Sequence, residues 1–100
     1  MGDAYLLLVK KMDANELLER YALGERNFHR ADLGGVRLIG ANLQGVDLSE
    51  ANLSFAYLRG IILRDVDLSG SDLRGAFLRG ADLRSANLDF ADLEGVVLAG

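Results

Sequence analysis

Leucine recurs at every fifth position from Leu33 to Leu98 without exception. Fourteen leucines therefore share one register, and a small or β-branched residue stands two positions before each of them. Neither a helix nor a flat strand can bury such a series, because a step of five rotates a helix by about 140° and moves a strand residue to the opposite face. A chain that turns a corner within every five residues can point all of these side chains at one axis. The pattern predicts a solenoid from residue 31 onward.

The positions on either side of each leucine carry residues that favour turns. Glycine stands two positions after the leucine in nine of the fourteen repeats, and Asp or Asn stands immediately before it in nine. Glycine adopts backbone angles that a Cβ would penalise, and short Asx side chains form hydrogen bonds to nearby backbone. We therefore predict that the corner lies two positions after each leucine. The chain contains no proline, whose missing N–H would interrupt hydrogen bonding between coils.

Units such as Ala-Asp-Leu-Arg-Ser at residues 81–85 and Ala-Asn-Leu-Asp-Phe at 86–90 resemble the pentapeptide-repeat family, and the resemblance covers residues 31–100. It implies a right-handed β-helix of square cross-section with four repeats, or twenty residues, in each coil. The sequence contains an independent sign of this period. Five repeats lack Asp or Asn before the leucine, and four of the five residues found there are spaced by twenty: Arg37, Tyr57, Phe77 and Val97.

A short helix is predicted before the repeats. Asp13 followed by Glu16 is typical of an N-cap with a capping box, and Gly24 is suited to the residue that ends a helix. We expect a helix over residues 14–23 that lies on the first coil and shields its open backbone edge. Its apolar face consists of Leu17, Leu18, Tyr21 and Ala22.

The predicted fold is an all-β solenoid, a right-handed quadrilateral β-helix of pentapeptide repeats with a short N-terminal α-helix cap. Phe28 takes the leucine position of an imperfect first repeat, residues 26–30. The segment 24–28 resembles the one that leads into the first coil of short cyanobacterial members with an N-terminal helical cap. We therefore divide the chain into a tail and capping helix, residues 1–25, and a β-helix of about 3.75 coils, residues 26–100.

Composition narrows the possible chemistry. The chain has no cysteine and one histidine, which argues against disulfides, cysteine nucleophiles and zinc sites. Its net charge of −4 argues against direct nucleic-acid binding. The apolar run Ala4 to Val9 is far shorter than the roughly 20 residues that span a bilayer, and Lys10 and Lys11 follow it, where a secretory signal would place charges before it. We expect a cytoplasmic protein without membrane association; whether this run forms a strand, a helix or a tail stays open.

No catalytic, metal or cofactor site is predicted. A short solenoid filled with leucine leaves no cavity of several hundred Å³ for a substrate or cofactor. His29 beside Arg30 and Asp32 is the nearest approach to a catalytic group, but no serine, cysteine or second carboxylate is expected in an arrangement that would make it a catalytic base. We interpret it as a solvated residue at the first corner. Ser71 occupies an inward position, where its hydroxyl is expected to donate to a neighbouring carbonyl.

Charged residues are distributed unevenly over the four predicted sides. Counted from residue 26, each side takes every fourth repeat, so side one begins with residues 26–30 and side three with residues 36–40. Side one has two arginines and four acidic residues, and side two has one arginine and four acidic residues. Side four has two of each and is neutral. Side three has three arginines and no acid. Because arginine and aromatic residues are enriched in interaction hot spots, we predict that an unknown protein partner binds through side three; the open C-terminal end is the other surface through which it could bind. The candidate residues are Arg37, Tyr57, Arg59, Phe77 and Arg79; the alternative is a solvated face whose column only stacks on itself.

An alternative function follows from the acidic sides one and two. Some members of the family imitate DNA and inhibit type II topoisomerases such as gyrase. Most acids on these two sides, however, are the turn-forming Asx residues, which are required whatever the partner is. A stack about 18 Å tall also covers only about five base pairs. A protein-binding module without catalytic activity is therefore the favoured prediction.

Self-association is the last prediction from the sequence. The chain stops at Gly100 within its final repeat, so the last coil is expected to expose backbone groups and leucine side chains. We predict a homodimer that joins C-terminal coils across a two-fold axis, an arrangement that resembles known dimers of the family. The candidate residues at this end are Phe90, Val97 and Leu98.

Overall fold

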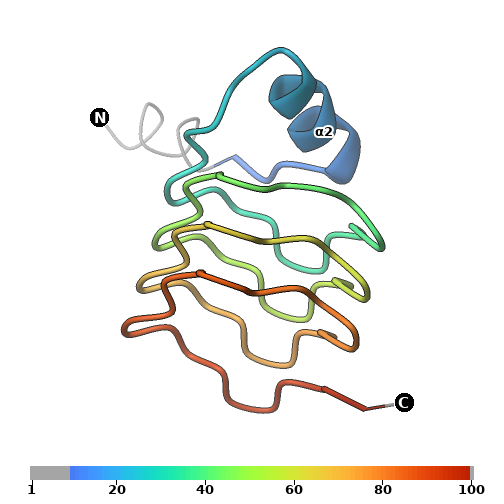
Figure 1. Ribbon diagram of the computed structural model, residues 1–100, viewed down its shortest axis with the longest axis vertical. Coiled ribbons are helices and arrows are strands. Elements are labelled where there is room, and N and C mark those ends of the chain that lie inside the picture. Colours follow the sequence, from blue (N-terminus) through green and yellow to red (C-terminus); the bar gives the residue numbers. More distant parts are fainter. Residues whose placement is uncertain (1–9, 100) are drawn as a thin grey trace.

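The computed structural model describes residues 10–99 and shows stacked coils beneath one helix, α2 (Ala14–Ala22) (Figure 1). From residue 27 onward, the β-structure consists of single parallel bridges, which join the residue before Phe28 or a leucine to the residue twenty positions later. Asn27 with Asp47 is the first such pair and Phe77 with Val97 is the last. The coil of twenty residues is thereby confirmed, and with it the four-sided β-helix.

Each corner lies two positions after the leucine, as predicted. The backbone has a positive φ, between 55° and 80°, at every such position from Arg30 to Gly95. This conformation is strained for a residue with a Cβ, yet six residues other than glycine adopt it. The coil therefore imposes the corner geometry even where glycine is missing. These six residues are Arg30, Glu50, Phe55, Asp65, Ser85 and Phe90.

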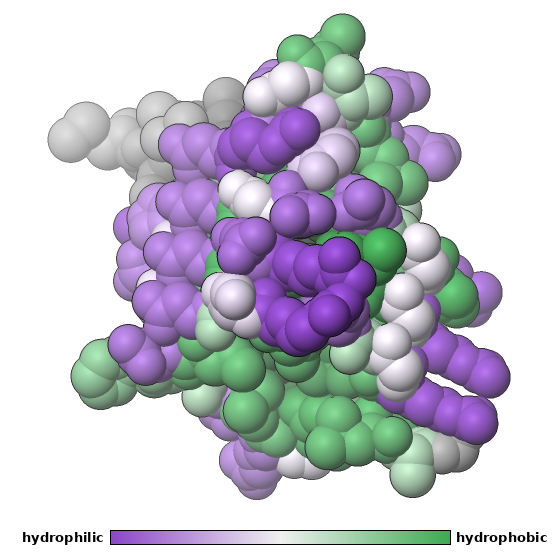
Figure 2. All heavy atoms as spheres, viewed as in Figure 1, coloured by the Kyte–Doolittle hydropathy of each residue, from purple (hydrophilic) through white to green (hydrophobic). Residues whose placement is uncertain are grey.

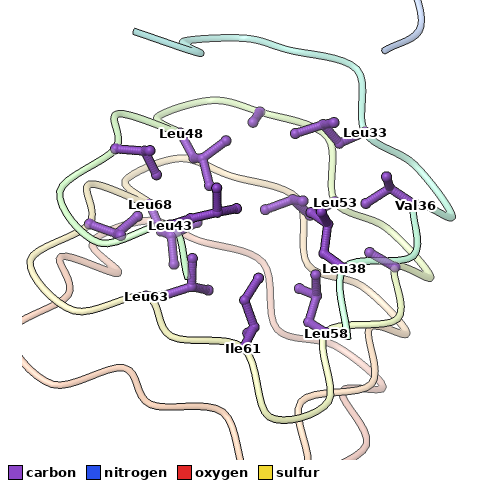
Figure 3. Close-up of a cluster of buried hydrophobic side chains, with 14 of the residues drawn as sticks. Leu33, Val36, Leu38, Leu43, Leu48, Leu53, Leu58, Ile61, Leu63 and Leu68 are labelled. Atoms are coloured by element: carbon purple, nitrogen blue, oxygen red, sulfur yellow. The ribbon is translucent and has the colours of Figure 1, made fainter. Parts of the chain in front are cut away.

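The leucine side chains converge on the axis of the solenoid (Figure 3). The leucines from Leu33 to Leu73 are at most 2% exposed, and the inward-facing Val46, Ala56 and Ile61 are at most 1% exposed. Phe28 is 2% exposed, which confirms that it takes the leucine position of the first repeat. Within residues 10–99, the core is thus a continuous column without polar side chains except Ser71.

Helix α2 begins and ends where the sequence predicts, to within one residue. The Asp13 carboxylate accepts a hydrogen bond from the Glu16 amide at 2.9 Å and so caps the N-terminus. At the other end Gly24, with a φ of 97°, donates to the Tyr21 carbonyl, and Glu25 donates to the Arg20 carbonyl. This pair of bonds is a Schellman motif, which ends the helix at Ala22 where we expected residue 23.

The helix covers the first coil. Leu17 is fully buried in the same hydrophobic cluster as Phe28 and Leu33. The Tyr21 hydroxyl donates to the Gln44 carbonyl at 2.9 Å and so fixes the helix to side four. The predicted shielding of the first coil is therefore confirmed.

The segment before the helix adds one rung that the sequence did not predict. Lys11 forms a parallel bridge with Asp32, and the Met12 amide donates to the Asp32 carbonyl at 2.8 Å. Met12 is 8% exposed and joins the core. The backbone edge of the first coil on side two is therefore paired. The apolar run from Ala4 to Val9 lies outside the described residues.

The last coil is much less covered than the first. Leu93 and Leu98 are 45% and 70% exposed, and Leu83 and Leu88 are only partly buried. Hydrophobic side chains accordingly gather over this end of the molecule in the space-filling view (Figure 2). The exposure expected of the last coil is confirmed. Among residues 10–99, no helix is long and apolar enough to cross a membrane.

Ser71 departs from the prediction made for it. The residue is buried, at 1% exposed, but its hydroxyl has no hydrogen-bond partner, so the predicted bond to a carbonyl is wrong. The carbonyls of Leu68 and Ala51 accept backbone amides instead. Ser71 stands in a column where the positions twenty residues away are Ala51 and Ala91. Its hydroxyl is therefore a buried polar group without compensation.

We expect Ser71→Ala to stabilise the protein by about 1 kcal/mol, because it removes this unsatisfied group without changing the shape of the core much. Urea unfolding measures the change. The matched control is Ala51→Ser in the same column, which should destabilise by a similar amount. A lower melting temperature for Ser71→Ala would mean that the hydroxyl has a partner.

Candidate functional site

The predicted column on side three forms as expected. Parallel bridges join Arg37 to Tyr57, Tyr57 to Phe77 and Phe77 to Val97. The rings of Tyr57 and Phe77 are stacked, with centroids 5.1 Å apart and planes 8° from parallel. Coils about 4.8 Å apart place flat rings at this distance. The Arg37 guanidinium carbon lies 5.1 Å from the Tyr57 centroid, so the column continues as a cation–π contact.

The stacked rings keep their edges in contact with solvent. Tyr57 is 39% exposed and Phe77 is 37% exposed, because each ring covers a face of its neighbour. A shallow hollow of about 210 Å³ opens between this column and a second column, formed by the residues that directly follow the leucines of side three: Ile39, Arg59 and Arg79. It is lined mainly by Tyr57, Phe77, Arg59, Arg79, Ile39 and Val97. The structure thus brings four of the five predicted residues of side three around one hollow.

Side three differs from the other sides in its electrostatics. It contains no acidic residue, although the chain as a whole carries a net charge of −4. On side two, by contrast, Arg74 forms two hydrogen bonds with Asp72, at 2.9 and 2.7 Å. On side four Arg84 does the same with Asp82, at 3.0 and 2.9 Å. Positive charge therefore accumulates on side three.

The acids of sides one and two serve the backbone. The Asp47 carboxylate accepts hydrogen bonds from the amide and the hydroxyl of Ser49, and Asp67 does the same with Ser69. Asp72 and Asp92 likewise accept from the amides two residues later. These are Asx turns, as the sequence predicted. The hydrogen bond from Ser69 lowers the pKa of Asp67. The carboxylates are therefore accounted for without a partner.

Asp82 ties two coils together on side four. It accepts hydrogen bonds from Arg84 in its own repeat and from Arg64 in the preceding coil. The bonds from Arg84, and then those from Arg64, hold the pKa of Asp82 well below its usual range. The hydrogen bond from Arg74 lowers the pKa of Asp72 in the same way.

These lowered pKa values predict acid sensitivity. A carboxyl group whose pKa is depressed in the folded state stabilises that state above its unfolded pKa of about 3.9, and this contribution is lost as pH falls toward the folded pKa. We expect the melting temperature to stay level between pH 7 and about pH 5 and to fall below about pH 4.

Thermal melts across this pH range test the prediction. The melting temperature of Asp82→Asn should fall less than that of the wild type, because the variant lacks one of the carboxyl groups whose pKa is lowered by folding. Equal melting temperatures at pH 7 and pH 3 would contradict the prediction.

His29 has neighbours that the sequence analysis did not expect. Its Nδ1 lies 2.8 Å from the Ser49 hydroxyl and its Nε2 lies 3.4 Å from the Glu50 carboxylate, two contacts that the sequence did not predict. The twenty-residue period, applied to His29, would have found Ser49. The Ser49 hydroxyl donates to Asp47, so His29 Nδ1 must donate to Ser49 and cannot act as its base. His29 is solvent-exposed, as predicted.

The surface also carries two open grooves, of about 510 and 400 Å³, so the prediction of no depression of several hundred Å³ is wrong. The larger one lies between the start of α2 and residues Gly34 to Arg37, and the smaller one lies beside Phe55. The larger groove arises where the start of α2 meets a corner of the first coil. The smaller groove arises where the Phe55 side chain reaches over the corner at Gly75. Neither lining contains a serine, threonine, cysteine or histidine.

The three residues predicted at the C-terminal end do not form one cluster. Val97 ends the column on side three, and Leu98 stands in the adjoining inward position with 70% exposure. Phe90 lies at another corner and is 96% exposed. Phe55, at an equivalent corner in the middle of the stack, reaches over Gly75 in the next coil, where a methyl group would meet the ring at 2.5 Å.

Comparison with known proteins gives consistent results. A family model described as pentapeptide repeats matches residues 27–65 and 61–100. The solved pentapeptide repeat protein alr5209 from Nostoc PCC 7120 is 44% identical over 89% of this chain and 78% of its own, with a TM-score of 0.51. Rfr23 from the cyanobacterium Cyanothece 51142 is 26% identical, over 73% of this chain and 57% of its own, with a TM-score of 0.61.

A third solved structure is HetL, a pentapeptide repeat protein involved in heterocyst differentiation regulation in Nostoc sp. strain PCC 7120. It is 36% identical, over 85% of this chain and 46% of its own, with a TM-score of 0.46. The chain thus spans about half the length of HetL and of Rfr23. No curated protein matches the chain.

Proposed function

Because this chain belongs to the pentapeptide-repeat family of right-handed quadrilateral β-helices, we propose that it is a non-catalytic module that binds another protein through side three. Proteins of the family are generally structural or interaction modules. The observation that carries the proposal is the hollow on side three, where two stacked aromatic rings lie beside Arg59 and Arg79. Aromatic residues and arginine contribute most of the binding energy in many protein interfaces.

The absence of catalysis is part of the same proposal. The interior is packed with leucine, and the hollow on side three is smaller than the roughly 300–1,000 Å³ of small-molecule sites. The linings of the two larger grooves contain no serine, threonine, cysteine or histidine. In the serine–histidine pair described above, the Ser49 hydroxyl donates its hydrogen bond to Asp47 and not to His29.

The alternative of a DNA mimic that inhibits gyrase has weaker support. Its acids would have to face the enzyme, whereas most of them accept hydrogen bonds within Asx turns. Side three, with its three arginines, would repel the positive groove that grips DNA. Inhibition of DNA supercoiling by the purified protein would favour this alternative over ours.

We expect Arg59→Glu combined with Arg79→Glu to abolish binding of the partner and to leave the melting temperature nearly unchanged. Both arginines lie on the surface, where substitutions usually change stability by less than about 0.5 kcal/mol. Capture of partners from lysate, quantified for wild type and variant, measures binding.

The control is Arg30→Glu combined with Arg84→Glu, which changes the net charge equally on other sides. It should capture the partner as the wild type does. If both variants lose the partner, overall charge is responsible and side three is not the site. A collapse of melting in the first variant would show that its arginines are structural.

We further propose that the protein forms a homodimer through its last coil. In preceding coils the amide of each core leucine donates to the next coil, as Leu63 does to Asp82 at 2.8 Å. Leu83 and Leu88 have no following coil within residues 10–99, and Phe90 and Leu98 are 96% and 70% exposed. A second copy related by a two-fold axis would cover this apolar end.

Sedimentation across concentration tests the proposal of a homodimer. A persistent 10.8 kDa monomer would refute it, and Val97→Glu should dissociate a dimer.

A further inference from the structure

We propose that the hollow on side three binds an acidic, extended peptide segment whose central apolar or aromatic side chain inserts between the ring edges and the arginines. The inference rests on the proposed function and names the chemistry of the partner. It follows from charge, from the size and lining of the hollow, and from the backbone beneath it.

Charge determines the sign of the partner. Side three has three arginines and no acidic residue in a chain whose net charge is −4. Partners with acidic side chains are attracted to this side and repelled by sides one and two, which carry an excess of acids. The exposed edges of the Tyr57 and Phe77 rings add to this preference, because the edge of an aromatic ring carries partial positive charge.

The hollow itself determines the anchor. A volume of about 210 Å³ is too small for most small-molecule ligands and suits a single side chain. Phe77 and Val97 form an apolar wall at one end of the hollow, and Ile39, which is 63% exposed, lies at the opposite end of the hollow. An apolar side chain inserted here removes these surfaces from water, and Arg59 and Arg79, which line the same hollow, attract carboxylates on either side of it.

The coil spacing determines the length of the segment. Ile39 and Val97 belong to repeats three coils apart, about 14 Å at 4.8 Å per coil. An extended chain covers this distance in about four residues at 3.3 Å each. Side chains of an extended chain alternate between its two faces, so acidic residues two positions before and two positions after the apolar anchor point toward the same surface and bring carboxylates to the arginines.

The backbone of side three excludes strand addition as the binding mode. The amides of Leu38, Leu58 and Leu78 already donate to the following coil, at 2.8–2.9 Å. A partner must therefore be recognised by side chains. The expected interaction is of modest affinity and sensitive to salt, since its charged contacts lie at an exposed surface.

Selection of random peptides displayed on phage tests the proposal. The wild-type protein is the bait, and the variant with Arg59→Glu and Arg79→Glu removes peptides that bind elsewhere. We expect the retained peptides to carry an apolar or aromatic residue with Asp or Glu two positions before or after it. Retained peptides that are basic or uncharged, or no retained peptide at all, would overturn the inference.

Fluorescence anisotropy then measures one retained peptide and the same peptide with alanine at the anchor. We expect at least tenfold weaker binding for the alanine peptide, for wild-type protein in 500 mM salt and for Phe77→Ala. Equal affinity of the two peptides would show that the hollow holds no anchor. If the peptides fail but lysate proteins are still captured by the wild type and lost by the arginine variant, the proposed function stands and only this inference falls.

Discussion

Replacing Leu63 by Asp is expected to prevent the chain from folding. Leu63 is 1% exposed and lies in the middle of the stack, where leucines of adjacent coils surround it (Figure 3). A carboxylate at this position would have no cation or hydrogen-bond donor to compensate the loss of water. The cost of burying it, several kcal/mol or more, is comparable with the total stability of about 5–15 kcal/mol of a small domain. Far-UV circular dichroism and urea unfolding measure the loss.

The matched control is Leu98→Asp. Leu98 occupies the same position of its repeat but is 70% exposed in the last coil, so its carboxylate can remain hydrated. In dilute solution, where a dimer would be dissociated, we expect this variant to keep the wild-type spectrum and to lose about 1 kcal/mol or less of stability. Melting of Leu63→Asp at the wild-type temperature would contradict the core described above. Equal losses in the two variants would show that the last coil is covered.

The fold could be predicted from the sequence because each coil repeats one local solution. Every inward leucine is paired with a corner two positions later, so fourteen weak signals agree on one architecture. Residues whose geometry the repeat does not fix were harder to place. Met12 lies outside the repeats, and its pairing with Asp32 depends on how the chain enters the stack. Asp13 and Gly24, by contrast, are local helix signals and were read correctly.

Contacts between coils mark the limit of what the sequence showed about the sites. The column of Tyr57 and Phe77 was predicted from the period of twenty, but the hollow beside it depends on the directions of the Arg59 and Arg79 side chains. The same period places Ser49 beside His29, a contact between coils that the residues next to His29 in sequence do not indicate. Ser71 shows the converse, because the repeat correctly predicts its inward position but does not determine whether its hydroxyl finds a hydrogen-bond acceptor.

Leu17→Ala is expected to have the second largest effect, a loss of about 2–5 kcal/mol. Leu17 is fully buried, and it is the only buried residue of α2. Its side chain packs in the cluster that contains Phe28 and Leu33, so truncation leaves a cavity between the helix and the first coil. A nine-residue helix has little stability of its own in water, and weaker packing therefore releases it from the stack. Urea unfolding measures the loss.

Leu18→Ala is the control, because Leu18 is the next residue of the same helix and is 38% exposed. It removes the same atoms and changes helix propensity equally, yet it should cost about 1 kcal/mol or less. Release of α2 by Leu17→Ala should also increase binding of a hydrophobic dye, since the first coil would then expose its leucines as the last coil already does. Equal stability of the two variants, with no gain in dye binding, would show that packing of Leu17 is not what holds α2 over the first coil.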